Sequence, residues 1–217
     1  MRTIRITGTG SALPGRIVTN KELEQMVETS DEWIRERTGI AERHVSVGET
    51  VVTLASEAAR KALEQAGKRA EEIDLILVAT CSPEQYLPCC ACQVQADIGA
   101  VNALAFDVNA ACSGFLFALN TADAYLRMGL AENALIIGSE VLSKLVDWTD
   151  RGSCILFGDG AGAVVVERCK AESRAVEEKQ IPAAGILGRA LHSDGTGGGV
   201  LQCDARELTT PLQGLRR

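Results

Sequence analysis

The sequence predicts an α/β protein with a mostly parallel sheet and helices on its faces. Apolar runs of strand length, such as residues 73–79, alternate along the chain with segments that repeat apolar residues at helical spacing. Several helical segments are followed by a glycine that can end them, at Gly67, Gly99 and Gly129. Strands that alternate with helices make crossover connections between parallel strands, and fully apolar strands suit a sheet covered on both faces.

The individual elements follow from the same patterns. Strands are expected at residues 3–7, 73–79, 103–109, 133–139 and 161–167, and another can begin at 186–191. Helices are expected near Lys21 and after Thr29, where capping boxes occur, before Gly67, and over residues 90–98 and 113–128. Residues 8–15 and 192–199 are rich in glycine and predict turns, and 170–180 predicts a polar surface connection.

Helix 113–128 is apolar nearly all round. A helix of this composition is buried, whereas a helix on the outside of a single sheet keeps one wet face. The composition therefore predicts a cover on both sides of this helix.

Composition excludes several classes of protein. The chain has 217 residues, of which 46% are hydrophobic and 24% charged, the balance of a soluble globular domain. No run approaches the roughly 20 apolar residues of a membrane span, and the alternating N-terminus, MRTIRITGTG, does not resemble a secretory signal. The net charge of −7 argues against nucleic-acid binding, although a local basic patch can still hold an anionic ligand.

The eight cysteines do not suggest a disulfide framework, because without a secretory signal a reducing compartment is expected. Cys89 and Cys92, with Cys81 nearby, resemble half of a metal site, but no second CxxC and no neighbouring histidine complete it. No metal is therefore expected. Six cysteines are interpreted as small buried apolar residues: Cys81, Cys89, Cys90, Cys92, Cys154 and Cys169.

Two glycine patterns, at residues 8–13 and 158–163, resemble dinucleotide-binding loops only superficially. The first lacks its third glycine, and the second is followed by Val164-Val165-Val166, a strand pattern. Phosphate binding by such a loop needs the N-terminus of a helix at that place. Tight turns and close backbone packing are the favoured interpretation.

Cys112 is the strongest candidate for chemistry. It stands in FDVNAACSGF, where a predicted strand ends and helix 113–128 begins. The N-terminus of a helix favours a thiolate, which is the nucleophilic form of cysteine. Its neighbours Ala110, Ala111, Ser113 and Gly114 are small and leave room for a substrate carbonyl, although most cysteines simply pack.

At this point the chain resembles the β-ketoacyl-acyl-carrier-protein synthase III family, condensing enzymes of the thiolase fold. The resemblance runs from Met1 to about Gly195 and rests on six separated motifs. They are GTGSALP (8–14), TSDEWIRERTGI (29–40), ACQVQ (91–95), FDVNAACSGF (106–115), TDRGS (149–153) and FGDGAGA (157–163). It implies an N-terminal half carrying the nucleophile at 1–170, and a connection with an incomplete start of the second half at 171–217.

The resemblance also implies roles for particular residues. Cys112 matches the nucleophile that accepts the acyl group. Trp33 and Arg151 match the pair that sandwiches the adenine of coenzyme A, and Thr29 matches a residue that hydrogen-bonds this base. Arg37 matches a further contact to coenzyme A, where a forked guanidinium suits phosphate. From the residues alone, solvated charges and a half-buried tryptophan are the simpler interpretation.

The residues for the acyl pocket and for the second catalytic step match the family less completely. Leu142 and Phe157 match acyl-pocket positions, whereas Leu87 stands where an aromatic residue reaches into the partner subunit's pocket, so the choice of primer is open. The family stabilises the oxyanion of the condensation step with a His and an Asn from its second half. His44 and His192 are the only histidines here, and neither matches that motif.

The implied enzyme is a cytoplasmic homodimer without a metal or a cofactor. It would condense an acyl-CoA primer, foremost acetyl-CoA, with malonyl-ACP to start fatty-acid synthesis. Two alternatives stay open. One is a thiolase-fold relative of polyketide or quinolone synthesis, and the other is a catalytically incompetent half that only binds ligand or dimerises.

Overall fold

The computed structural model describes residues 2–170, 173–176, 179–182 and 185–203. The chain divides into two compact units, Met1–Leu187 and Gly188–Arg217. The predicted boundary between residues 170 and 171 concerns the two halves of the family and stays a prediction. All the elements of the candidate site described below belong to the first unit.

A five-stranded sheet forms the centre of the first unit, in the order β1-β7-β6-β4-β5. The strands are β1 (Arg2–Ala12), β4 (Leu75–Ala79), β5 (Leu104–Val108), β6 (Asn133–Val141) and β7 (Asp159–Lys170). Strands β4, β5 and β6 pair in parallel, and β7 pairs antiparallel with both β6 and β1. Four of the five strands therefore run in one direction, which confirms the predicted mostly parallel sheet.

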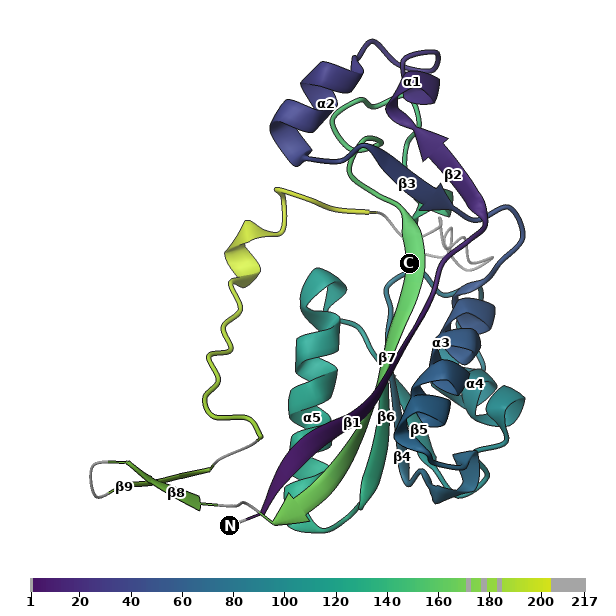
Figure 1. Ribbon diagram of the computed structural model, residues 1–217. Helices are drawn as coiled ribbons and strands as arrows, with labels where there is room; N and C mark the ends of the chain where they lie inside the picture. Colours follow the sequence, from purple (N-terminus) through teal and green to yellow (C-terminus); the bar gives the residue numbers. More distant parts are fainter. Residues whose placement is uncertain (1, 171–172, 177–178, 183–184, 204–217) are drawn as a thin grey trace, which may run out of the picture. The chain divides into compact units, whose positions relative to one another are not determined.

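Helices cover the two faces of this sheet (Figure 1). On one face α3 (Val51–Ala66) packs on β1, β6 and β7, and α4 (Cys90–Ile98) packs on β4 and β5. On the other face lies α5 (Gly114–Met128). Gly67, Gly99 and Gly129 end these helices with positive φ angles of 64°, 78° and 79°, as the sequence predicts.

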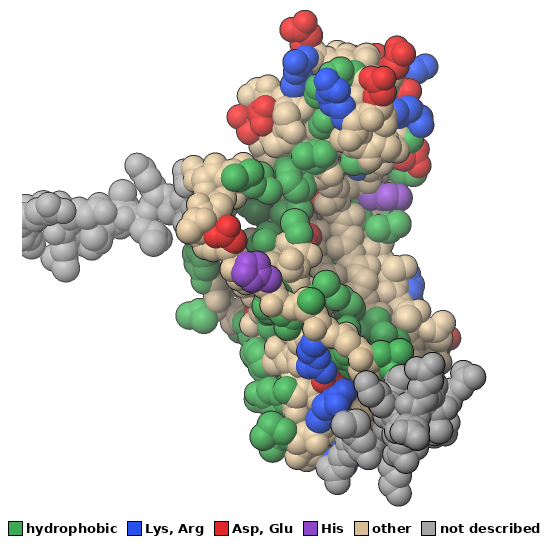
Figure 2. All heavy atoms as spheres, turned by 90° about the vertical axis from the view of Figure 1, so that its left-hand side faces the viewer, with side chains coloured by type: hydrophobic (Ala, Val, Ile, Leu, Met, Phe, Trp, Pro, Cys, Tyr) green, Lys and Arg blue, Asp and Glu red, His purple; other side chains and the backbone are tan. Residues whose placement is uncertain are grey.

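A small region stands beyond the end of the sheet at which β1 finishes and β7 begins (Figure 1). It contains the antiparallel pair β2 (Arg16–Thr19) and β3 (Glu42–Val45), and the helices α1 (Asn20–Leu23) and α2 (Asp31–Thr38). Leu23, Ile34, Cys154 and Ile155 form its own core. Figure 2 shows basic and acidic side chains mixed over the surface at this end of the molecule. The sequence predicts the two helices but not the two short strands.

The predicted turn at residues 8–15 is wrong in its first half, because β1 continues to Ala12. The glycines there serve close packing instead: a Cβ at Gly10 would lie 2.6 Å from the backbone nitrogen of Ala62 in α3. The second glycine pattern, 158–163, lies inside β7 apart from Gly158, as the strand interpretation requires. Both patterns therefore serve packing and strand formation.

Among the described residues helix α5 is buried on one side only, so a cover on its second side stays a prediction. Ala118, Ala122 and Leu126 are fully buried against the sheet, whereas Leu116 is 56% exposed and Met128 is 74% exposed. The reason is that the elements described in this unit pack against only one face of the helix. An apolar face therefore remains uncovered.

The rest of the described chain is less regular. Strands β8 (Ser173–Val176) and β9 (Lys179–Pro182) pair with each other, and a short 3₁₀ turn, η4 (Gly195–Gly197), lies in the second unit. The strand expected at 186–191 does not form, although Ile186 packs against the core beneath α5. The tail, 204–217, lies outside the described residues. Within the described part of the chain, every helix is too short or too polar to cross a membrane.

Candidate active site

Cys112 lies where the sequence places it, between β5 and α5. It is the central residue of a single 3₁₀ turn, η2 (Ala111–Ser113), and its side chain is exposed. Ala111, directly before it, has a φ of +45°, the one non-glycine residue with positive φ in the described chain. Such a left-handed backbone costs free energy at an alanine and persists where the surroundings impose it, often at functional sites.

Close packing holds this turn against the ends of the parallel strands. A Cβ at Gly114 would lie 3.1 Å from the Cβ of Ala79, the last residue of β4. The N–H of Thr80 donates to the carbonyl of Val108 at 3.2 Å, which joins the segments that leave β4 and β5. Ligands bind at this carboxyl end of the strands in open α/β sheets.

Glu140 of β6 organises the segment that follows β4. Its carboxylate accepts hydrogen bonds from the N–H of Cys81 at 2.8 Å and from the hydroxyls of Thr80, at 3.1 Å, and Ser82. Burial first, and then the charge of Glu140, raises the pKa of the Cys81 thiol to about 11. Cys81 therefore stays a neutral thiol at neutral pH, although it lies near Cys112. A neutral thiol is a weaker nucleophile than a thiolate.

The residues predicted to hold coenzyme A come together in the small region. The guanidinium carbon of Arg37 lies 4.6 Å from the centre of the Trp33 ring, and that of Arg151 lies 5.1 Å from it. Arg151 also donates to the carbonyl of Glu28 at 3.1 Å. An aromatic ring with two cations above it is a site for a planar, anionic ligand.

Thr29 lies at the start of α2, but it does not cap the helix. Ser30 is the N-cap, and its hydroxyl accepts a hydrogen bond from the N–H of Trp33 at 3.1 Å. The N-cap therefore lies one residue later than predicted, and the predicted capping box with Glu32 does not form. The hydroxyl of Thr29 is buried and has no hydrogen-bond partner in the structure. An unpaired buried hydroxyl two residues before α2 is a feature that a ligand could satisfy.

Arg43 is a residue that sequence analysis missed. Its side chain is 5% exposed and donates to the carbonyls of Val18 and Ile155, both at 3.2 Å, and to the Oδ1 of Asn20 at 2.9 Å. Asn20 in turn donates to Asp31, the first residue of α2, at 2.8 Å. Burial lowers the pKa of Arg43. No feature of the single sequence distinguishes this arginine from its exposed neighbours.

The Arg43 network connects the two segments that carry the predicted ligand contacts. One end is α2, with Trp33 and Arg37, and the other is the loop 145–158, with Arg151 and Phe157. The loop is folded locally: the carboxylate of Asp150 accepts from the N–H of Gly152 at 2.9 Å. The relative position of Trp33 and Arg151 is thus set by buried hydrogen bonds.

The predicted acyl-pocket residues are spread over three segments. Leu142 begins the turn η3 (Leu142–Lys144) after β6 and is half-buried, as is Phe157, which lies two residues before β7. Leu87 lies on the loop between β4 and α4 and is 84% exposed. The described chain places Leu142 and Phe157 in packed surroundings but leaves Leu87 in solvent.

Neither histidine belongs to the segments that carry Cys112. His44 lies in β3, with its Nδ1 2.6 Å from the carbonyl oxygen of Pro14. His192 belongs to the second compact unit and is exposed. The base or oxyanion donor of a condensation step is therefore not assigned to either residue.

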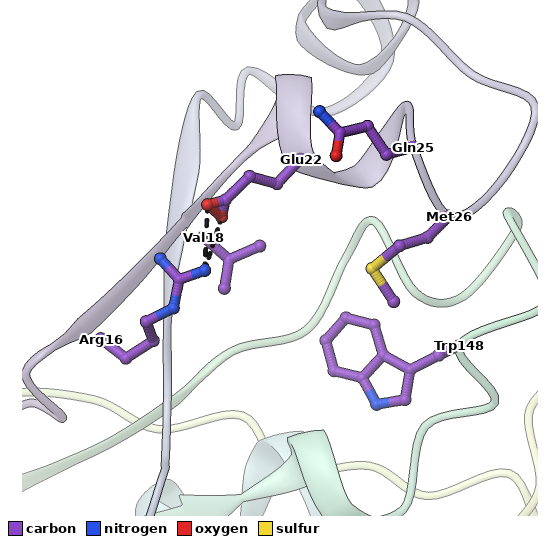
Figure 3. A pocket seen from close by; sticks show the side chains of 6 residues that line it. All are labelled: Arg16, Val18, Glu22, Gln25, Met26 and Trp148. Carbon is purple, nitrogen blue, oxygen red and sulfur yellow. Dashed lines mark hydrogen bonds and ion pairs between the residues drawn. The ribbon is translucent and has the colours of Figure 1, made fainter.

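A shallow hollow of about 640 Å³ is lined by residues of β2, of α1 and the turn after it, and of the loop 145–158 (Figure 3). The ion pair between Arg16 and Glu22, 2.9 Å long, lies on one side, and Met26 points toward the ring of Trp148 on the other. None of the predicted site residues lines it. Its lining residues are Arg16, Val18, Glu22, Gln25, Met26 and Trp148.

The interpretation of six cysteines as buried apolar residues is wrong for four of them. Only Cys90 and Cys154 are buried, while Cys81, Cys89, Cys92 and Cys169 are partly exposed. Cys89 and Cys92 lie at the start of α4, at the edge of the packed layer.

Comparison with known proteins agrees with this arrangement. The sequence profile of the family 3-oxoacyl-[acyl-carrier-protein] synthase III matches residues 106–195. β-Ketoacyl-[acyl-carrier-protein] synthase III of Clostridium acetobutylicum is 50% identical over 98% of this chain. The chain spans 62% of that relative's length, less than two thirds.

Solved structures show the same similarity. The crystal structure of 3-oxoacyl-[acyl-carrier-protein] synthase III from Aquifex aeolicus is 51% identical, with a TM-score of 0.77 over 78% of this chain and 55% of that one. The priming β-ketosynthase of the R1128 polyketide pathway is 38% identical, also with a TM-score of 0.77, over 79% of this chain and 52% of that one.

The sheet, the helix that follows Cys112 and these similarities identify the thiolase fold, which the structures of condensing enzymes share. The motifs and the relatives named above make the chain similar to the β-ketoacyl-[acyl-carrier-protein] synthase III family.

Proposed function

We propose that the protein to which this chain belongs is a β-ketoacyl-ACP synthase III, which condenses an acyl-CoA primer with malonyl-ACP. The observation that carries the proposal is the position of Cys112, exposed in the turn between β5 and α5. Its thiolate attacks the carbonyl carbon of the acyl-CoA thioester, the acyl group forms a new thioester with Cys112, and coenzyme A leaves as its thiolate. Acetyl-CoA is the primer we favour.

Coenzyme A would be held by the small region. The adenine would stack on Trp33, with Arg151 on its other side, and the hydroxyl of Thr29 would gain a partner on the base. A base between the ring and the guanidinium needs a van der Waals distance on each side, roughly 7 Å in all. Since Arg151 lies 5.1 Å from the ring centre, it must withdraw by about 2 Å on binding.

The remaining assignments belong to the same proposal. Arg37 would contact the phosphates of coenzyme A, and Leu142, Phe157 and Leu87 would contribute to the acyl pocket. Exposure of Leu87 favours a homodimer in which this side chain reaches the partner subunit. The location is proposed as the cytoplasm, with no metal or cofactor required for the transfer.

The test is acylation of Cys112. The protein is incubated with acetyl-CoA, and digestion followed by mass spectrometry locates the acetyl group. We expect it on Cys112 and expect the Cys112→Ala variant to remain unmodified. If the variant were acetylated as fast as the unchanged protein, the assignment of the nucleophile would be wrong.

Polyketide priming is the second candidate, and the similarity to the R1128 priming enzyme favours it. The two candidates differ in the primer and in the carrier protein rather than in the step at Cys112. Comparing acetyl-CoA with longer and branched acyl-CoA esters in the same assay separates them. Coenzyme A binding without transfer to Cys112 would instead support a half that only binds ligand.

A further inference from the structure

Cys89 and Cys92 occupy a particular pair of positions at the N-terminus of α4. Cys89 is the N-cap, with φ −65° and ψ 156°, and its carbonyl accepts the first helical hydrogen bond, from Gln93 at 3.2 Å. Cys92 is the third residue of the helix. Cys89 makes no side-chain cap hydrogen bond, but residues three apart on a helical turn are neighbours, so these positions bring the two side chains close.

Both thiols are accessible and close to each other. Each side chain is partly exposed. Hydrogen bonding to the Cys89 side chain is the largest of the causes that raise the pKa of the Cys92 thiol, followed by burial. The Cys92 thiol also lies 3.6 Å from the carbonyl oxygen of Ala105 in β5. The two thiols therefore lie on the same turn at the start of α4, and both are partly open to solvent.

Asp107 fixes the backbone on which this pair stands. Its carboxylate accepts hydrogen bonds from the N–H of Cys90 at 2.8 Å and from the N–H of Ala91 at 2.7 Å. The start of α4 is thereby anchored to β5. Residues three apart on a helical turn are neighbours, so an anchored backbone at these two positions favours the short distance between α-carbons that a disulfide requires.

Cys90 does not compete for either partner. It is 1% exposed and belongs to the core between α3, α4 and the sheet. Burial raises the pKa of its thiol to about 12, so it is almost entirely protonated at neutral pH. Metal binding offers no better explanation of the pair, since the residues that the structure describes hold no cluster of three His, Cys, Asp or Glu side chains suited to an ion.

We propose that Cys89 and Cys92 form a redox-active dithiol that a peroxide oxidises reversibly to an intrahelical disulfide. One thiolate attacks an oxygen of hydrogen peroxide, gives a sulfenic acid and releases hydroxide. The second sulfur attacks the sulfenic sulfur, the S–S bond forms, and the hydroxyl leaves as water. Two thiols and one peroxide yield one disulfide and two waters, and the peroxide accepts both electrons.

This site is independent of the condensing activity. Nothing in the argument uses Cys112 or coenzyme A, so the proposed function can fail without affecting it. The modification would lie two residues from Leu87, on the loop that leads into α4.

Peptide mapping tests the proposal directly. The intact chain is treated with hydrogen peroxide, the free thiols are blocked with iodoacetamide, and the protein is cleaved after Glu84 and before Asp97. The resulting peptide, residues 85–96, contains Cys89, Cys90 and Cys92 and no other cysteine. We expect this peptide to lose two hydrogen atoms, two of its three thiols to escape alkylation, and dithiothreitol to restore all three.

Single substitutions identify the partners. Cys90→Ala keeps a small apolar side chain in the core and should form the disulfide as the unchanged chain does. Cys89→Ser and Cys92→Ser should both lose it. Three results would overturn the proposal: an unchanged peptide mass, a disulfide that persists in either serine variant, or a bridge to a cysteine outside residues 85–96.

Discussion

The two faces of the central sheet differ in how completely other elements cover them. On the face covered by α3 and α4, an extensive core is closed, and helix backbone lies directly on Gly8 and Gly10 of β1. On the face covered by α5, the core is smaller, and one side of the helix remains exposed at Leu116. Among the described residues, the helix layer of α3 and α4 is therefore closed, whereas the layer of α5 is open to solvent on one side.

A hollow lies on the face of the sheet that α5 covers. It has a volume of about 430 Å³, beside the N-terminal part of α5. Its lining consists largely of small residues, namely Thr9, Gly10, Phe115, Gly138, Gly162, Ala163 and Val164. Small residues on a sheet permit close approach of another element. The open face agrees with the fact that the chain spans less than two thirds of its relatives' length.

The largest expected consequence concerns the condensation step on the open side. A polypeptide of residues 1–217 alone should acylate Cys112 slowly and release no β-ketoacyl product. Neither histidine occupies the segments around Cys112, and losing one oxyanion donor typically costs about 10²–10³ in rate. Mass spectrometry of the protein and of the carrier-protein product, after incubation with acetyl-CoA and malonyl-ACP, measures both steps. Rapid turnover without a second polypeptide would contradict this account.

Cysteine reactivity should follow the same difference between the faces. Cys112 is exposed at the start of α5. Cys90 is buried in the core on the other face, and burial raises the pKa of its thiol to about 12. A pKa this far above that of a free thiol, about 8.5, lowers the thiolate fraction roughly 10³-fold. Iodoacetamide labelling with peptide mapping at pH 8 should therefore modify the exposed Cys112 well before the buried Cys90. Faster labelling of Cys89, Cys92 or Cys154 would argue against a reactive Cys112.

The sequence predicts the closed face better than the open one, for a physical reason. Helix α3 carries its apolar residues at a regular spacing and ends at Gly67, so both its position and its buried face follow from local pattern. Helix α5 shows the same apolar character, but pattern alone cannot tell whether a second layer is present. Its exposure depends on which other elements pack against it.

The candidate site divides in a similar way. Cys112 and the pair of Trp33 and Arg151 could be predicted because motifs carry them. The positive φ of Ala111 and the burial of Arg43 could not, since both depend on contacts between distant segments: Arg43 bonds to Ile155, 112 residues away. The displaced cap at Ser30 shows that two adjacent hydroxyl residues leave a helix start uncertain by one position.

Alanine substitutions at two glycines on neighbouring strands compare the packing of the two faces through the free energy of unfolding. A Cβ at Gly10 would lie 2.6 Å from the Ala62 nitrogen and still closer to the carbonyl oxygen of Ala58, whereas a Cβ at Gly162 meets nothing within 4 Å. Gly10→Ala should lower the free energy of unfolding by about 1–3 kcal/mol or more. Gly162→Ala, the matched control, should change it by less than about 0.5 kcal/mol. Urea denaturation measures both, and equal effects would show that the two faces are packed alike.

The smallest expected effect tests whether ligand binding depends on the open face at all. Trp33 lies in the small region, whose core of Leu23, Ile34, Cys154 and Ile155 is separate from both faces of the sheet. Coenzyme A should therefore bind even where α5 is uncovered, and Trp33→Ala should weaken binding by about 1–2 kcal/mol because a stacking surface is lost. Isothermal titration calorimetry measures the change.

Two further variants separate stacking from a general loss of structure. Trp33→Phe keeps an aromatic face and should retain most of the affinity. Trp148→Phe alters the chain's other tryptophan, which lines the separate hollow of Figure 3, and should leave binding unchanged. An unchanged affinity in Trp33→Ala would reject the stacking site. Equal losses in Trp33→Ala and Trp148→Phe would mean that the small region has unfolded, because Trp148 is not among the proposed ligand contacts.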